Sequence, residues 1–350
     1  MHNHRPRRSE HGQVIMVAAL LLPLLLGMAA LAVDVGGYSA HRRNLQNAAD
    51  AIALAAARDL PSATDAQTTA NVYAAKNGID PADMTVTVIP QGGSVANPTV
   101  RVAISRSHNF SFIGALGAGA KLVSASAAAI KTSPGGSASL MPWAITQSAE
   151  GSATPGSLVT LKYDATGGSQ GNFGAIQLDG PGSNTYQSEI QKGSSSVVCA
   201  QGVTTCTDTS SPCTGSVCPS QTGNMVGSTR SGVDYRITNT DPHCDTFAEV
   251  FSGPVNGKFT LNALCNPWLG GSYTSLRVVM VPIVTGLCNG NCDLTITGFA
   301  LFWLEGYGSG GCTGNSCEIT GRFVNADLTT NALVGVYSAD SSTHFVRLSE

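Results

Sequence analysis

The sequence predicts three parts: an N-terminal transmembrane helix, a small α+β unit, and a C-terminal all-β domain stapled by disulfides. Three observations predict this fold class. Residues 14–33 are apolar and uncharged, the periodicity changes from helical to alternating near residue 85, and all ten cysteines lie between Cys199 and Cys317. The expected parts are a cytoplasmic tail over 1–13, the transmembrane helix over 14–33, the helix-then-strand unit over 34–131, a linker over 132–139, and a β-rich extracytoplasmic domain over 140–350.

The composition favours an extracytoplasmic protein. A chain of 350 residues is long enough for one or two domains beyond a membrane segment. Charged residues make up 12% of it, about half the usual share for a soluble protein, and the 40 glycines suit a fold with many turns. The net charge is -3 and no basic stripe lies beyond the first residues, so a nucleic-acid partner is excluded.

The transmembrane helix is expected over Val14–Val33. A helix of these twenty residues is about 30 Å long, which matches the hydrocarbon core of a bilayer. Pro23 is tolerated because a helix in lipid can absorb a local kink. A cleaved signal peptide is the alternative, since Ala30-Leu31-Ala32 fits a cleavage site. Its apolar core usually has only about 7–15 residues, so a retained anchor is favoured.

The orientation follows from the cysteines rather than from the flanking charges. Arg5, Arg7 and Arg8 precede the span and Arg42 and Arg43 follow it, so the positive-inside bias is weak. Disulfides need an oxidising compartment. We therefore expect a single-pass protein of the cytoplasmic membrane with its N-terminus inside and its C-terminal domains in the periplasm or at the cell surface.

The α+β unit is expected to contain two helices followed by strands. Apolar residues recur every three to four positions between Asp34 and Leu60, where Pro61 should end the first helix. Gly78 is placed to cap a second helix. Beyond it apolar and polar residues alternate, as they also do around Phe110 and Phe112. The second helix and the strands are expected at 65–77, 85–88, 100–104 and 122–130, and the Gly/Ser-rich linker follows at 132–139.

The region from Leu140 onward has an almost purely β pattern. Residues 199–245 form a long polar segment that carries cysteines, and we expect it to be a stapled loop. Only Tyr186–Gln191 indicates a short helix. The expected strands lie at 157–163, 277–284, 294–304 and 318–324.

The ten cysteines are disulfide candidates. Three close pairs predict local bridges, and the other four are expected to pair among themselves, although spacing cannot fix connectivity. A zinc site is the alternative, but the chain has no CxxC pair. His243-Cys244-Asp245 beside Asp241 could also ligate a metal, although a disulfide at Cys244 is favoured. The local pairs are Cys213/Cys218, Cys288/Cys292 and Cys312/Cys317, and the remaining cysteines are Cys199, Cys206, Cys244 and Cys265.

Three strings match catalytic or nucleotide-binding motifs but lack the required context. Ser169 lies in a G-x-S-x-G string with His243 and His344 downstream, but no strand–turn–helix pattern surrounds it. Gly306–Gly311 matches G-x-G-x-x-G but should be a turn, because Cys312–Asn315 cannot start a helix. Gly114–Lys121 lacks the second glycine and the Ser/Thr of a P-loop. The sequence predicts no catalytic, cofactor-binding or metal residue, no cofactor, and no enzyme activity.

The N-terminal segment resembles a known family. Gly12-Gln13, the apolar span, Val33-Asp34-Val35-Gly36, Arg43–Ala51 and an alanine-rich helix follow one another in the order typical of TadE/TadG-like proteins of tight-adherence (Flp-type) pili. The resemblance implies a membrane-anchored structural or assembly component of such a pilus or of a related surface-secretion machine. It also implies other pilus-assembly proteins or pilins, and the cytoplasmic membrane, as partners. Segments 171–176, 223–229, 296–300 and 321–324 resemble a subset of this family.

The chain departs from the family pattern at two points. Some members carry a von Willebrand A domain with an Asp-x-Ser-x-Ser motif, but the nearest string here, Asp208–Pro212, lacks the last serine. Processed pilins of this kind have Glu five residues after the cleaved Gly, and counting from Gly12 that position is Val17. These departures favour an assembly role over an ordinary pilin. A surface-exposed adhesin or binding protein and a secreted hydrolase using Ser169 are the alternatives.

Overall fold

The chain divides into two compact units in a computed structural model. The first unit comprises residues 1–89, 99–129 and 348–350, and the second comprises 90–98 and 130–347. The structure describes residues 11–115, 117, 119–164, 172–204, 206–210, 212–255, 257–268, 273–327, 333–335, 337–338, 341 and 343–349.

The first unit is built on one long helix. α1 (His11–Ala57) continues through Pro23 without interruption, so the expected span and the expected first helix of the α+β unit are one element. α2 (Ala63–Lys76) follows, and Ser62 Oγ caps its start by accepting a hydrogen bond from Asp65 N at 3.3 Å. It ends as expected, with Gly78 in a left-handed conformation at φ 68°.

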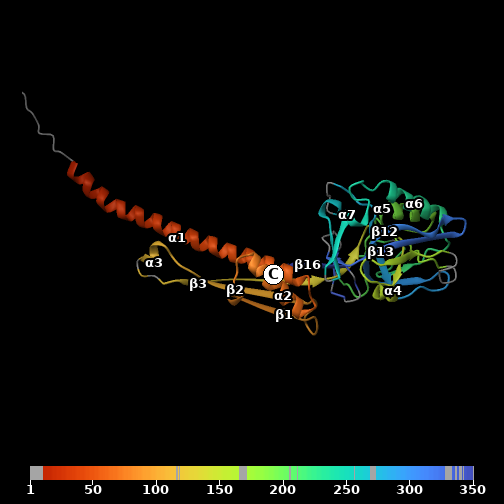
Figure 1. The fold of residues 1–350 in the computed structure, drawn as a ribbon, viewed down its shortest axis with the longest axis horizontal. Coiled ribbons are helices and arrows are strands. Elements are labelled where there is room, and N and C mark those ends of the chain that lie inside the picture. Colours follow the sequence, from red (N-terminus) through yellow and green to blue (C-terminus); the bar gives the residue numbers. More distant parts are fainter. Residues whose placement is uncertain are drawn as a thin grey trace, which may run out of the picture. The chain divides into compact units, whose positions relative to one another are not determined.

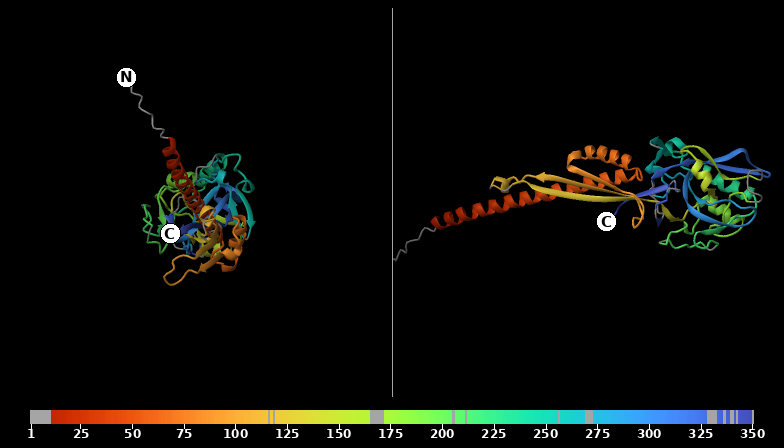
Figure 2. Two further views of the ribbon diagram at one scale, coloured as in Figure 1. Left: turned by 90° about the vertical axis from the view of Figure 1, so that its left-hand side faces the viewer. Right: turned by 90° about the horizontal axis from the view of Figure 1, so that it is seen from below.

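Three strands complete the first unit. β1 (Met84–Ile89) pairs antiparallel with β2 (Thr99–His108), and β3 (Lys121–Thr132) lies next to β2. A 3₁₀ turn, η1 (Pro81–Asp83), precedes them. Val100, Val102 and Ile104 on alternate positions of β2 are buried, and the half of α1 that follows the apolar run packs against this strand. Figures 1 and 2 show α1 running alongside β2 and β3.

The tip between β2 and β3 differs from the expectation. We expected Phe110 and Phe112 to continue the strand pattern, but Phe112 begins a short helix, α3 (Phe112–Ala115). The side chain of Asp34, which is distant in the sequence, accepts hydrogen bonds from the backbone of this segment.

The second unit is built on a central sheet in the order β5-β11-β12-β13-β6. β8 (Val217–Pro219) also pairs with β12, and the helices α4 (Gln147–Ser152), α5 (Ser183–Lys192) and α6 (Val226–Thr238) belong to the same unit. The sheet strands are β5 (Ile145–Thr146), β6 (Leu158–Lys162), β11 (Val278–Val284), β12 (Asp293–Thr313) and β13 (Ser316–Val324).

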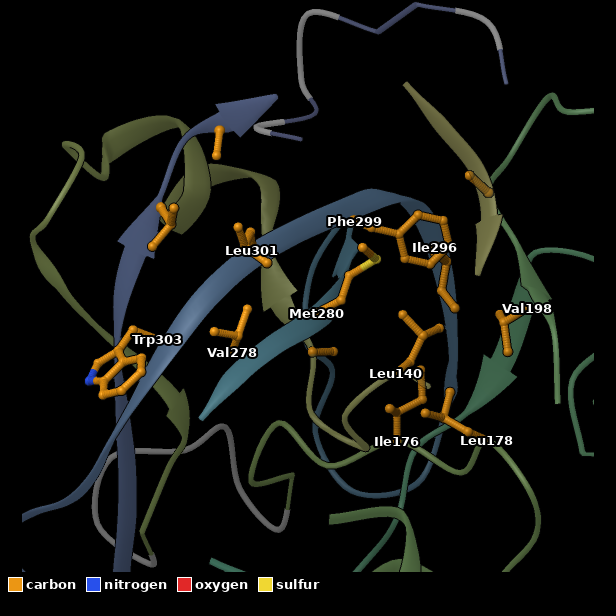
Figure 3. Close-up of a cluster of buried hydrophobic side chains, with 14 of the residues drawn as sticks. Leu140, Ile176, Leu178, Val198, Val278, Met280, Ile296, Phe299, Leu301 and Trp303 are labelled. Carbon is orange, nitrogen blue, oxygen red and sulfur yellow. The ribbon is translucent and has the colours of Figure 1, made fainter. Parts of the chain in front are cut away.

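Both faces of the central sheet are buried. Val278, Met280 and Leu301 lie in one apolar cluster, shown in Figure 3, whereas their neighbours Val279 and Phe302 lie in another. Every residue of β11 is buried, which explains its nearly continuous apolar sequence.

Short strands form the rest of the second unit. One small sheet has the order β15-β4-β7, and β16, β14, β10 and β9 are successive neighbours in another. A short helix, α7 (Phe247–Val250), and a 3₁₀ turn, η2 (Ala263–Cys265), also lie here. These strands are β4 (Pro134–Ser137), β7 (Val198–Cys199), β9 (Phe251–Val255), β10 (Lys258–Leu261), β14 (Ala326–Asp327), β15 (Leu333–Val334) and β16 (Thr343–Ser349).

Three details of the second unit differ from the sequence predictions. Residues 132–139, expected as a linker, contain the buried strand β4 and belong to the second unit. The expected loop at 199–245 contains β8 and the thirteen-residue helix α6, so this strand-rich region is not purely β. Gly306–Gly311, expected as a turn, lies inside β12, whose pairing with β13 shifts register there.

Candidate assembly segment and the disulfide-bonded unit

The first half of α1 is an exposed apolar surface. The large side chains from Ile15 to Val33 are between about half and three quarters exposed, for example Leu20 at 77%. The helix is long and apolar enough to cross a membrane, and its most apolar window is not buried within the structure. An apolar surface of this kind is typical of a helix that contacts lipid.

The second half of α1 is packed. Leu45, Ala48, Ala49, Ile52 and Ala56 are almost completely buried at helical spacing. This face packs against α2 and β2. The small alanine side chains allow the two helices to approach closely, since Ala66, Ala70 and Ala74 form the facing side of α2 and are also buried.

Asp34 joins α1 to the tip between β2 and β3. Asp34 is only 3% exposed, although its neighbours Val33 and Val35 are more than half exposed. The carboxylate accepts hydrogen bonds from three successive backbone N–H groups, of Ser111 at 2.8 Å, Phe112 at 3.0 Å and Ile113 at 2.6 Å. These donors lie at the start of α3, where a helix has no internal acceptors, so the carboxylate determines the local conformation.

Aromatic rings surround this contact. The ring of Tyr38, one turn after Asp34, stacks on Phe110 with centroids 6.2 Å apart and meets His108 edge-on at 5.9 Å. The His41 ring lies 5.2 Å from the His108 ring. A Cβ at Gly37 would lie 3.8 Å from the His108 ring, in van der Waals contact, so this face of α1 lies directly against His108. Val33-Asp34-Val35-Gly36 therefore begins a docking surface for β2 and α3.

Polar residues of the family-like segment divide between two faces of α1. The Gln46 side chain donates to Asp50 Oδ1 at 2.9 Å and to the backbone oxygen of Ser126 at 3.0 Å, which ties the helix to β3. Arg43, Asn44 and Asn47 are exposed on another face. Within the described parts of the chain, the side chains of these three residues have no hydrogen bond or ion pair. Their side chains are available to another molecule.

The ten cysteines form five disulfides, all in the second unit. Two bridges close longer loops, at separations of 7 and 21 residues, whereas three close loops of four or five residues. Cys312 and Cys317 face each other across the β12–β13 hairpin. Cys244 and Cys265 are completely buried within the core. The pairs are Cys199–Cys206, Cys213–Cys218, Cys244–Cys265, Cys288–Cys292 and Cys312–Cys317.

Lys162, Glu189 and His344 are among the buried titratable side chains of the second unit. Lys162 is fully buried, and its Nζ donates to Asn224 Oδ1 at 2.7 Å, while burial lowers its pKa to about 8. Burial raises the pKa of Glu189 to about 7, although one of its oxygens accepts a hydrogen bond from Asp179 N at 2.6 Å. Burial and the nearby positive charges of Lys131 and Lys258 lower the pKa of His344 to about 3.

The structure adds no support for the catalytic and metal-binding candidates among the described residues. Ser169 lies outside the described residues, and His344 is buried beside Ser133 Oγ at 3.3 Å. His243 Nδ1 lies 2.9 Å from Asp241 Oδ1, but the adjacent Cys244 is disulfide-bonded. Among the described residues, no group of three or more His, Cys, Asp or Glu side chains could hold a metal.

A comparison with known protein families finds a match for α1. The family model for Flp pilus-assembly TadE/G-like proteins matches residues 12–59, which are α1 and the turn that follows it. No curated protein and no solved structure matches the chain significantly. The sequence signal that located this segment was the order of its polar residues around an apolar run. Residues 12–59 are therefore similar to the Flp pilus-assembly TadE/G-like family.

Proposed function

We propose that this protein is a membrane-anchored structural component in the assembly of a tight-adherence (Flp-type) pilus or a related surface-secretion machine. The observation that carries the proposal is that the family-matched segment folds as one helix with an exposed apolar half and a packed half. A helix of this kind ties a folded unit to a membrane. The family is one of structural pilus-assembly proteins, so the proposed activity is contact with other proteins rather than catalysis.

The proposed topology has α1 crossing the cytoplasmic membrane with residues 14–33 and the N-terminus inside. Both compact units then lie in the periplasm or at the cell surface. Five disulfides in the second unit support this orientation, because such bonds persist in oxidising compartments. Pilins or other assembly proteins are the proposed partners.

The proposed contact surface for these partners is the exposed polar face of α1 at Arg43, Asn44 and Asn47. These residues belong to the family-matched segment and project from a helix whose opposite face is fixed by packing. Because the backbone of the helix is already ordered, only these side chains lose conformational entropy when they form hydrogen bonds with a partner.

A matched pair of substitutions tests this surface. Asn47→Lys adds a charge to the proposed contact face and should reduce the number of surface pili. Asn71→Lys makes the same change on an exposed position of α2 and should leave pili unchanged. Both proteins should accumulate to wild-type levels, as measured by immunoblotting, because neither side chain is buried. Equal piliation of the two variants would contradict the proposed surface.

Deletion of the gene tests the wider proposal. Cells lacking the protein should lose or reduce surface pili while pilin still accumulates inside them. Normal piliation would contradict the assembly role. Binding of the purified protein to a glycan or a surface would then favour an adhesin, and a hydrolytic turnover abolished by Ser169→Ala would favour a hydrolase.

A further inference from the structure

We propose that the tip between β2 and β3 is a second membrane contact, which inserts into the interfacial layer of the same bilayer that α1 crosses. The tip consists of Phe112 and Ile113 in α3 together with Lys121 and Leu122 at the start of β3. This inference rests on the proposed membrane anchoring and adds a lipid-binding surface to it.

The position of the tip follows from Asp34. The uncharged apolar run ends at Val33, and the carboxylate of the very next residue holds the backbone of Ser111, Phe112 and Ile113 by hydrogen bonds of 2.6–3.0 Å. If residues 14–33 fill the hydrocarbon core, Asp34 lies at its outer boundary. The tip is therefore held at the depth of the interface.

The exposed side chains of the tip suit that depth. Phe112 is 50% exposed and Leu122 is 63% exposed, even though both belong to a folded hairpin. Val35 on α1 is 53% exposed, so the apolar surface of the helix continues past Asp34. Tyr38 stacks on Phe110 beside them, and aromatic side chains with a polar end favour the boundary between lipid and water.

Basic residues complete the surface. Lys121 is exposed at the tip, next to Leu122. Arg42 is also exposed, eight residues after Asp34, and a helix rises about 12 Å over that length. Long basic side chains at such positions can reach lipid phosphates while their carbon chains lie along apolar surface.

Lipid is the occupant that these observations favour over a protein. The exposed apolar tip lies beside the end of a helix whose surface is itself apolar for about 30 Å, so one bilayer can cover both without a second binding partner. A pilin helix or a second copy of this chain would have to displace lipid from the same place.

Fluorescence quenching by brominated lipids tests the proposal on the full chain in vesicles of phosphatidylcholine and phosphatidylglycerol. All three native tryptophans, Trp143, Trp268 and Trp303, lie in the second unit and provide a constant background. Phe112→Trp should add emission that bromines near the headgroup end of the acyl chains quench. Leu122→Trp should behave in the same way and serves if the first variant does not fold.

Two control positions determine how the result is interpreted. Val72→Trp, on an exposed position of α2, should add emission that the bromines do not quench. Leu22→Trp, inside the apolar run, should be quenched by bromines deep in the bilayer. Quenching at Leu22→Trp but at neither tip position would overturn the proposed lipid contact while leaving the anchor in place. Quenching at none of the positions would overturn both, whereas the piliation tests would remain a separate measure of function.

Discussion

Asp34 shows how one side chain can connect two parts of the first unit. Its carboxylate satisfies three successive backbone N–H groups at the start of α3, a segment 77–79 residues away in sequence. Those donors have no acceptor within so short a helix, and an ionised acceptor makes stronger hydrogen bonds than a neutral one. Asp34 therefore contributes to both the shape of the tip and its position along α1.

Substitution Asp34→Asn should loosen the tip. The amide of Asn keeps one acceptor oxygen and replaces the other with an NH2 donor. The asparagine side chain therefore cannot accept hydrogen bonds from all three N–H groups in the way that the carboxylate does. Amide hydrogen exchange at Ser111, Phe112 and Ile113 should become faster, as measured by mass spectrometry on the full chain in detergent. Asp80→Asn is the matched control, because the Asp80 carboxylate accepts a hydrogen bond from Ala82 N, two residues away, rather than from the tip. Unchanged exchange at the tip would show that other contacts hold it.

Glu189 and His344 should give the second unit opposing pH dependences. The pKa of Glu189 is raised to about 7, so the folded unit binds this proton more tightly and loses stability as the pH rises from about 5. The pKa of His344 is lowered to about 3, so the folded unit resists protonation and loses stability as the pH falls below about 6.5. Each effect should amount to about 2 kcal/mol between pH 7.5 and pH 5, and the two should largely cancel.

Single substitutions should reveal each effect. Glu189→Gln removes the first effect, so the variant should be less stable at about pH 5 than at about pH 7.5. His344→Asn removes the second, so its stability should change in the opposite direction. The measurement is chemical unfolding followed by tryptophan fluorescence, which reports on the second unit because every tryptophan lies there. Flat profiles for both variants would contradict the assignment.

At the scale of elements, the strongest periodicities were sufficient for prediction and the weaker ones were not. The two helices of the first unit and the strands β2, β3, β11 and β12 were predicted because their apolar residues recur with a clear period. α6 was missed because its sequence is rich in Gly, Ser and Thr, which disfavour helices. It is stable through packing: a Cβ at Gly232 would lie 2.5 Å from Ile190 Cγ2, and buried Arg236 donates to Leu276 O at 2.6 Å.

The expectation of a linker at residues 132–139 was wrong because here too tertiary packing, rather than local sequence, determines the structure. Residues 132–139 contain Gly135 and Gly136, which indicate flexibility when only the local sequence is considered. In the structure a Cβ at Gly135 would lie 2.7 Å from Gly335 Cα, and one at Gly136 would lie 2.3 Å from Cys206 Sγ. The glycines are needed because β4 passes close to two other segments. Contacts of this kind involve residues distant in sequence, and no local pattern reports them.

Removal of disulfides should cost stability according to loop length. In the chain-entropy account, the bridge Cys244–Cys265, which closes a loop at a separation of 21 residues, contributes about 3 kcal/mol. Cys312–Cys317, at a separation of five residues, contributes about 2 kcal/mol. Double substitution of each pair by alanine should lower the unfolding free energy in that order, as measured by urea unfolding with tryptophan fluorescence. The reverse order would show that native-state packing dominates.

At the scale of the whole molecule, the sequence predicted the family-matched helix α1 better than the domain boundaries. An apolar run followed by Asp, Gly and polar residues in a fixed order was enough to locate α1, because these features are local. The boundary between the units is different, since residues 90–98 lie in the second unit although both flanking strands belong to the first. Tertiary contacts determine such an assignment. The contact between Asp34 and α3 could not be predicted either, because it joins segments more than 70 residues apart.

We expect that the anchor is retained and that the protein is not a bulk subunit of the fibre. Val17 occupies the position where a processed pilin of this type has Glu, and its side chain is 55% exposed on the apolar half of α1. A valine cannot pair with the new amino terminus of a neighbouring subunit, and in lipid or in a fibre core no water would replace that lost partner. The second unit is also large and disulfide-bonded, so it would crowd a thin fibre of small subunits.

Mass spectrometry of the purified protein should therefore find residues before Gln13 still attached, and the protein should stay with the membrane when filaments are sheared from cells. Val17→Glu should not by itself move the protein into filaments, because the bulk of the second unit is unchanged. An N-terminus at Gln13, with the wild-type protein abundant along sheared filaments, would show that it is a processed pilin.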